Sequence, residues 1–105
     1  MSNAEGKSLQ YLMIIAEQKK KKTFLSLIGE HGGHSIDVVY ARGSVNPNTF
    51  ASVFGFEVEQ GKVIITCLLK YEDAEKLINV LYEEYNFKKP NTGIAFCISV
   101  EGLAF

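Results

Sequence analysis

Four short apolar runs, two in each half of the chain, limit its fold more than any other feature. The runs are residues 9–16, 35–41, 62–69 and 94–100. Each run has the length and the content of branched and aromatic residues that are typical of a β-strand. None approaches the length of a membrane-spanning helix, and the start of the sequence lacks the apolar stretch of a signal peptide. The sequence therefore predicts four strands and no insertion into a membrane.

The first and third runs are each followed by an amphipathic segment, residues 20–30 and 72–86. Both segments carry apolar side chains at helical spacing, which predicts a helix with one buried stripe in each. The stripes are Phe24, Leu27, Ile28 and His31 in the first helix, and Ala74, Leu77, Ile78, Leu81, Tyr82 and Tyr85 in the second. Gly32-Gly33 is expected to end the first helix, and Pro90 cannot extend the second.

The order strand, helix, strand occurs twice, on either side of an irregular middle at residues 45–60. Such an order predicts an α+β fold, the ferredoxin-like βαββαβ sandwich: a four-stranded antiparallel sheet with two helices on one face. A sheet covered on one side normally shows polar side chains on the other, but runs 9–16, 62–69 and 94–100 are apolar on both faces. We therefore expect a second copy of the chain to cover the open face.

Length and composition place the chain among ordinary globular proteins of one domain. It has 105 residues, of which 47% are hydrophobic and 22% charged, and a net charge of −1, so no overall field attracts nucleic acid. Residues 1–7 include Ser2-Asn3-Ala4, which resembles an expression tag, so the predicted domain is 8–105. Cys67 and Cys97 lie in apolar runs and are interpreted as reduced core residues, which favours a cytoplasmic location.

A polar loop enters the last predicted strand and is the main candidate for a ligand site. It contains Lys88, Lys89, Pro90, Asn91, Thr92 and Gly93. One interpretation is a plain helix stop. The other is a cradle for an anion or nucleotide, in which backbone N–H groups and the two lysines face the ligand, and Gly93 supplies a positive φ or a close approach to the backbone.

His31 and His34 form an H-x-x-H pair across the glycine turn and offer a different kind of site. With a third ligand such as Glu30 or Asp37 they would bind a metal, as in a CutA-like oligomer or a small enzyme. A helix-end histidine beside a turn histidine is the simpler interpretation. The chain lacks a nucleophile elbow and a phosphate-binding GxGxxG or P-loop motif, so a non-enzymatic protein is expected.

Three segments, in this order and spacing, resemble the PII family of nitrogen-regulatory signalling proteins, above all its PII-like branch with a short T-loop. Residues 32–43 resemble the family's glycine turn, second strand and the base of its T-loop. Residues 63–78 resemble the third strand and second helix, and residues 92–100 resemble the B-loop and fourth strand. Together these segments cover most of the chain from Leu9 onward.

The resemblance implies a homotrimer that binds adenine nucleotides in clefts between subunits. It also implies that the T-loop, here within residues 45–60, docks onto a membrane transporter or an enzyme. Carried over by position, phosphate contacts fall on Asn91, Thr92 and Gly93 with Lys88 and Lys89 nearby, the T-loop base falls on Arg42, Gly43 and Ser44, and Ser35 lies near the adenine pocket.

Several features of the family are missing from this sequence. The lysine that usually follows the last B-loop glycine is replaced by Ile94, and the C-terminal arginines that reach the phosphates have no counterpart. The T-loop glutamine and the modifiable tyrosine are also missing. Because each charge-assisted phosphate contact contributes roughly 1.5–3 kcal/mol, these changes point to a cleft whose ligand differs from ATP.

Overall fold

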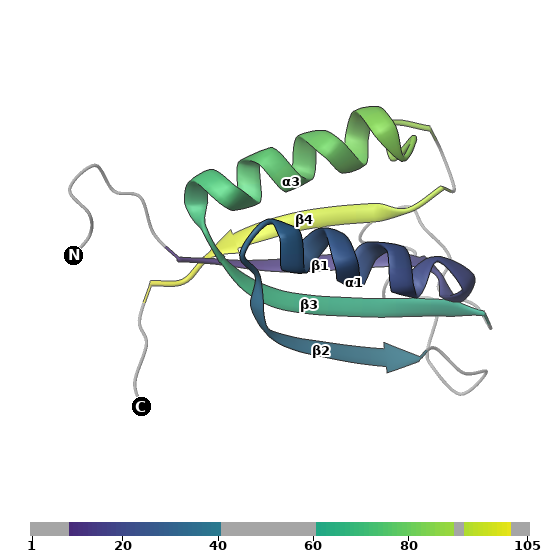
Figure 1. The fold of residues 1–105 in the computed structure, drawn as a ribbon, viewed down its shortest axis with the longest axis horizontal. Coiled ribbons are helices and arrows are strands. Elements are labelled where there is room, and N and C mark those ends of the chain that lie inside the picture. The colour runs from purple at the N-terminus through teal and green to yellow at the C-terminus, as the bar shows by residue number, and fades with distance from the viewer. Residues whose placement is uncertain (1–8, 41–60, 90–91, 102–105) are drawn as a thin grey trace.

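The predicted strands form one antiparallel sheet in the order β2-β3-β1-β4, with both helices on the same face (Figure 1). The computed structural model describes residues 9–40, 61–89 and 92–101. The elements are β1 Leu9–Glu17, a short 3-10 helix η1 Gln18–Lys20, α1 Lys21–Glu30, β2 His34–Tyr40, β3 Lys62–Lys70, α3 Tyr71–Glu84 and β4 Ile94–Ser99. The predicted α+β, ferredoxin-like arrangement is confirmed.

The register of the strands places alternate side chains on the helix-facing side of the sheet. Leu12 of β1 pairs with Cys67 of β3 on one side and with Cys97 of β4 on the other, and Ile14 pairs with Ile65 and Ala95. Because side chains alternate along a strand, these positions share one face. That face and the inner sides of α1 and α3 enclose the hydrophobic core.

The core, called the central core below, consists of side chains that are at most 8% exposed. It contains Leu12, Ile14, Ala16, Phe24, Leu27, Ile28, Val63, Ile65, Cys67, Leu69, Ala74, Leu77 and Leu81. Phe24 of α1 makes edge-to-face contacts with Tyr85 and Phe87, with ring centroids 5.6 Å apart in each pair, and so ties α1 to the segment after α3. Tyr82, which the helical spacing placed in the core, is 50% exposed instead.

The glycine pair after α1 ends that helix as predicted. Gly32 has φ 83°, and its N–H donates to the carbonyl of Gly29 at 3.1 Å, while the Gly33 N–H donates to the carbonyl of Ile28 at 2.8 Å. This is the hydrogen-bond pattern of a Schellman motif. A Cβ at Gly33 would lie 2.3 Å from Cγ2 of Ile28, so the second glycine is required by packing.

The end of α3 differs from the prediction. The helix was expected to continue to Asn86 and to stop at Pro90, but it ends at Glu84. Asn86 has φ 62°, a left-handed conformation that asparagine tolerates, and the Phe87 N–H donates to the carbonyl of Leu81 at 3.1 Å. Asn86 therefore turns the chain before Pro90, which lies outside the described residues.

The face of the sheet opposite the helices keeps large apolar side chains exposed. Tyr11 of β1, Val39 of β2 and Ile98 of β4 are 37%, 56% and 54% exposed. The exposure is uneven, since Ile15 and Thr66 on this open face are buried. No helix within the described parts of the chain is long and apolar enough to cross a membrane.

Candidate functional site

The loop predicted to cradle an anion is described at Lys88, Lys89, Thr92 and Gly93, whereas Pro90 and Asn91 lie outside the described residues. Gly93 is buried, and it is not among the residues with positive φ. A Cβ at this position would lie 2.6 Å from Cζ of Phe87, so the space that a side chain would need is filled by the Phe87 ring. The expected left-handed φ is therefore wrong, and contact with an aromatic ring is one reason for a glycine here, while its predicted role beside a ligand stays a prediction.

Lys88 and Lys89 precede that loop and are exposed. The Lys88 Nζ atom lies 3.3 Å from Oε1 of Glu83, and the Lys89 backbone N–H donates to the carbonyl of Asn86 at 2.9 Å. An exposed ion pair of this kind contributes at most about 1 kcal/mol. An incoming anion would therefore compete with Glu83 for Lys88 at little cost.

Ser35 lies far from the loop within one chain. It is exposed, has φ 54°, and stands at the start of β2, at one edge of the sheet. Thr92 precedes β4, at the other edge, and the registers place the start of β4 beside the end of β1 and the start of β2 beside the end of β3. Three strand spacings separate the two edges by about 14 Å. Ser35 and Thr92 therefore do not meet in one copy of the chain.

The predicted T-loop base, Arg42, Gly43 and Ser44, lies outside the described residues, as do Asn91 and residues 45–60. The last residue of β2 before this segment is Tyr40. The Lys21 Nζ atom donates a hydrogen bond to the Tyr40 hydroxyl at 2.5 Å and lies 5.2 Å from its ring centroid. Lys21 belongs to the lysine run at residues 19–22, which the sequence alone presents as a solvated charge cluster.

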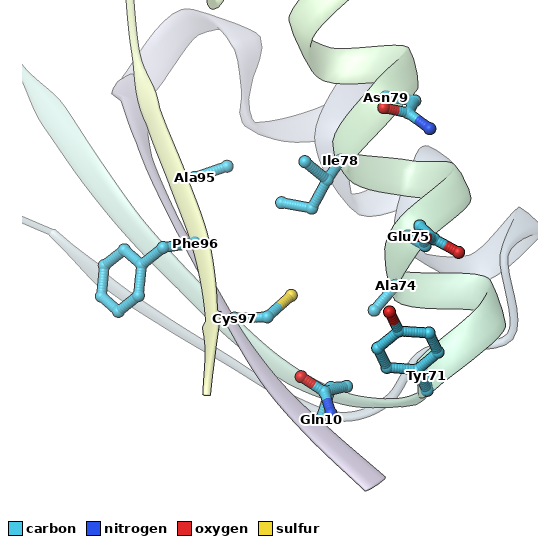
Figure 2. A pocket seen from close by; sticks show the side chains of 9 residues that line it. All are labelled: Gln10, Tyr71, Ala74, Glu75, Ile78, Asn79, Ala95, Phe96 and Cys97. Carbon is cyan, nitrogen blue, oxygen red and sulfur yellow. The ribbon is translucent and has the colours of Figure 1, made fainter. Parts of the chain in front are cut away.

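A pocket that sequence reasoning missed lies between α3 and β4 (Figure 2). Its volume is about 290 Å³. Its lining consists of Gln10, Tyr71, Ala74, Glu75, Ile78, Asn79, Ala95, Phe96 and Cys97. Ile78, Ala95 and Cys97 point into the space between the helix and the strand, whereas the Phe96 ring points away from it.

A second pocket of about 230 Å³ adjoins the first, because both are lined by Ile78 and Ala95. It is also lined by Phe87 and Gly93, the contact pair described above. We call the two pockets together the α3–β4 groove. The groove runs along an edge strand of the sheet, from the Gln10 end of the molecule to the entrance of β4.

The two cysteines lie on either side of Leu12, one in the central core and one in the α3–β4 groove. Both are free thiols, which agrees with their interpretation as reduced residues. Burial, with a smaller contribution from Cys97, raises the pKa of Cys67 from 9.0 to about 11. Burial also raises the pKa of the Cys97 thiol. Both thiols therefore stay protonated and unreactive near neutral pH.

The histidine pair does not form a metal site in the described part of the chain. The Nδ1 atom of His31 is 2.8 Å from the carbonyl oxygen of Leu27, so this nitrogen carries the proton and donates to the carbonyl. His34 is exposed at the start of β2. No group of three or more histidine, cysteine or acidic residues that could hold a metal exists among the residues described.

The sequence alone does not predict the groove. Ala74, Ala95 and Cys97 are small, but small residues are common in helices and strands. Their effect depends on the strand register and on the helix rotation, which bring them to face one another. Once the fold was assumed, small residues at facing positions of β4 and α3 were the only available sign.

No protein-family model matches the chain, and no curated protein matches it. Solved structures do. A protein of Thermus thermophilus described as a PII-like signalling protein has a TM-score of 0.63 at 20% identity, covering 88% of this chain and 85% of its own. CPII from Thiomonas intermedia, a nitrogen regulatory PII-like protein bound to ADP, AMP and bicarbonate, has a TM-score of 0.61 at 18% identity, covering 92% and 96%.

Arabidopsis thaliana PII bound to citrate has a TM-score of 0.60 at 18% identity, with 93% of this chain and 82% of the Arabidopsis chain covered. These identities are low, while most of each chain is aligned. The comparisons therefore show that this chain has the fold of PII-like nitrogen-regulatory proteins.

Proposed function

We propose that this chain is a PII-like regulatory protein without enzymatic activity. In this proposal it forms a homotrimer, binds a small molecule in clefts between subunits, and signals to a transporter or enzyme target through residues 45–60. Its fold supports the proposal, since the similar CPII binds ADP, AMP and bicarbonate and the similar Arabidopsis PII binds citrate. Adenine nucleotides are accordingly the first ligands to test.

The observation that carries the proposal is the exposed apolar side chains on the open face of the sheet. Tyr11, Val39 and Ile98 come from three different strands and are each more than one third exposed. Tyr11 and Ile98 are paired neighbours on this face, and exposed apolar side chains that lie together favour an interaction site. Contact with two further copies of the chain would bury it.

The separation of the predicted ligand residues also favours a site shared between subunits. Ser35 and Thr92 lie at opposite edges of one sheet. A cleft that uses both can form only where the β2 edge of one copy approaches the β4 edge of another. Lys88, whose ion pair with Glu83 is exposed, would stand at the rim of such a cleft.

Sedimentation velocity at micromolar concentration tests the assembly. We expect a species of three times the 11.7 kDa chain mass. The Ile98→Glu variant places a charge on the open face and should dissociate, because burying an unpaired charge is strongly unfavourable. Tyr82→Glu is the matched control, since Tyr82 is similarly exposed but lies on α3, and it should remain assembled. A stable wild-type monomer would contradict the trimer.

Thermal unfolding with ADP, AMP, ATP, bicarbonate and 2-oxoglutarate tests the ligand. A ligand at about 100 times its Kd stabilises the folded state by about 2.7 kcal/mol, a shift of several degrees in Tm. Lys88→Ala and Thr92→Ala should reduce the shift caused by a nucleotide. Lys76→Ala, which removes an exposed lysine from the body of α3, should not. A trimer whose Tm none of these compounds changes at millimolar concentration would refute the ligand class while leaving the assembly intact.

A further inference from the structure

The α3–β4 groove is open because small side chains face one another across it. Ala95 and Cys97 are the helix-facing residues of β4, and Ala74 and Ile78 oppose them from α3. On the two central strands, β1 and β3, the helix-facing residues are mostly isoleucine, leucine and valine, and these are fully buried. A helix packed over two small residues at a sheet edge leaves a gap between the two layers that the surrounding side chains do not fill.

The lining of the groove selects the chemistry of its ligand. Apart from the carboxylate of Glu75, the side chains around the larger pocket are uncharged, and no lysine or arginine of the described residues lines either pocket. In Figure 2 the Glu75 and Asn79 side chains point away from β4, while Gln10 and Tyr71 lie at the same end of the pocket, with the Tyr71 hydroxyl beside Ala74. An anion would therefore meet no positively charged partner in these pockets, whereas an apolar group would contact apolar side chains.

We propose that the α3–β4 groove is a second ligand site, which binds a small, uncharged, mainly apolar molecule with its hydrogen-bonding group directed at the Gln10 and Tyr71 end. The pocket volume of about 290 Å³ is at the lower limit of typical ligand pockets and fits a molecule with one or two rings. This site lies between the helix layer and the sheet. The larger pocket contains none of the residues assigned to the inter-subunit cleft, whereas the smaller pocket reaches Gly93, which is one of them.

A ligand bound in the groove would affect the position of the loop that precedes β4. The smaller pocket shares Ile78 and Ala95 with the larger one and is closed by Phe87 and Gly93. Gly93 has no room for a Cβ beside the Phe87 ring, so displacement of that ring displaces the loop backbone. A ligand in the groove would thus alter the entrance to β4 without touching Lys88.

Titration of the ¹⁵N-labelled protein with indole, a flat apolar molecule with a single N–H donor, tests the site. We expect saturable amide shift changes at Ile78, Ala95 and Cys97, with a Kd between about 0.1 and 1 mM. Ala95→Leu fills the groove and should weaken binding at least about tenfold. Cys97→Leu serves as a second filling variant with the same expected loss. Lys76→Ala alters an exposed residue of α3 that lines neither pocket and should leave the Kd unchanged.

The thiols give an independent readout from the same samples. Cys97 lines the groove, whereas Cys67 is fully buried, so N-ethylmaleimide at mildly alkaline pH should label Cys97 first, and saturating indole should slow that labelling several-fold. The proposal is wrong if shift changes cluster at Tyr11, Val39 and Ile98 instead. It is also wrong if both folded filling variants bind indole as the wild type does. Neither result depends on whether nucleotides bind.

Discussion

The central core and the α3–β4 groove lie on the same face of one sheet and share a helix, yet one is closed and the other open. Leu77 of α3 is fully buried in the central core, while Ile78 on the same helix is only partly buried beside β4. The strand partners explain the difference. Leu77 belongs to the same cluster as Ile14, Ile65 and Leu69, whereas Ile78 faces Ala95 and Cys97.

The comparison indicates that the volume of the facing side chains, together with the position of β4 at the edge of the sheet, decides where this sandwich closes. Protein interiors are close-packed, so a closed region stabilises the fold and resists any change of volume. A region lined by alanine and cysteine lacks those contacts but keeps space for another molecule. The two regions should therefore respond differently to the same substitutions.

The largest expected difference concerns truncation of a large side chain. Phe24→Ala should lower the free energy of unfolding by about 3–5 kcal/mol, because Phe24 is buried in the central core and contacts Tyr85 and Phe87. Ile78→Ala should cost only about 1–2 kcal/mol, since Ile78 borders an existing pocket and is partly hydrated. Urea unfolding at one fixed protein concentration measures both values. Equal losses would mean that the groove is filled in solution.

The opposite change is the enlargement of an alanine. Its effect on the free energy of unfolding should differ between the two regions by a smaller amount. Ala16→Leu inserts a larger side chain into the central core and should cost about 1–3 kcal/mol. Ala95→Leu makes the same replacement on β4, where the groove accommodates it, and should change the free energy of unfolding by less than about 0.5 kcal/mol.

The two alanines are a matched pair because both lie on the helix-facing side of adjacent strands. Thermal or urea unfolding of both variants under the same conditions measures the two changes in the free energy of unfolding. A loss for Ala95→Leu as large as that for Ala16→Leu would show that the groove is too narrow for a leucine, and by extension for an aromatic ligand.

The fold was predictable from the sequence because its signals are local and repeated. The apolar runs predicted the ends of the four strands to within one residue, and the glycine pair predicted the end of α1. The end of α3 was not predictable from Pro90, because Asn86 adopts a left-handed φ earlier in the chain. Tyr82 follows the apolar stripe in spacing, but the helix rotation leaves it exposed.

The candidate site was less predictable because it depends on distant residues. The sequence singled out Gly93 but not its contact with the Phe87 ring, which forms only after the turn at Asn86. Ser35 and Thr92 were assigned to one cleft on the basis of resemblance, and one sheet holds them at opposite edges. The groove became visible only when the register brought Ala95 and Cys97 opposite Ala74.

The smallest expected effect compares the two cysteines at alkaline pH. The pKa of Cys67 is about 11 in the folded protein and 9.0 at its ordinary value, so the folded state retains the proton longer than the unfolded chain. This contribution to the free energy of unfolding is complete below about pH 9 and is lost as the pH rises toward about 11. The loss amounts to about 1 kcal/mol by about pH 10.

The pKa of Cys97 is raised as well, but the groove leaves this thiol more hydrated, so the corresponding loss of stability should be smaller. Urea unfolding near pH 8 and pH 10 measures the change in the free energy of unfolding between the two pH values. This change should be smaller in Cys67→Ala than in Cys97→Ala. Titration of the tyrosines contributes equally in both variants. If the free energy of unfolding changes equally with pH in the two variants, the two thiols are equally shielded from water, and the distinction between core and groove is wrong.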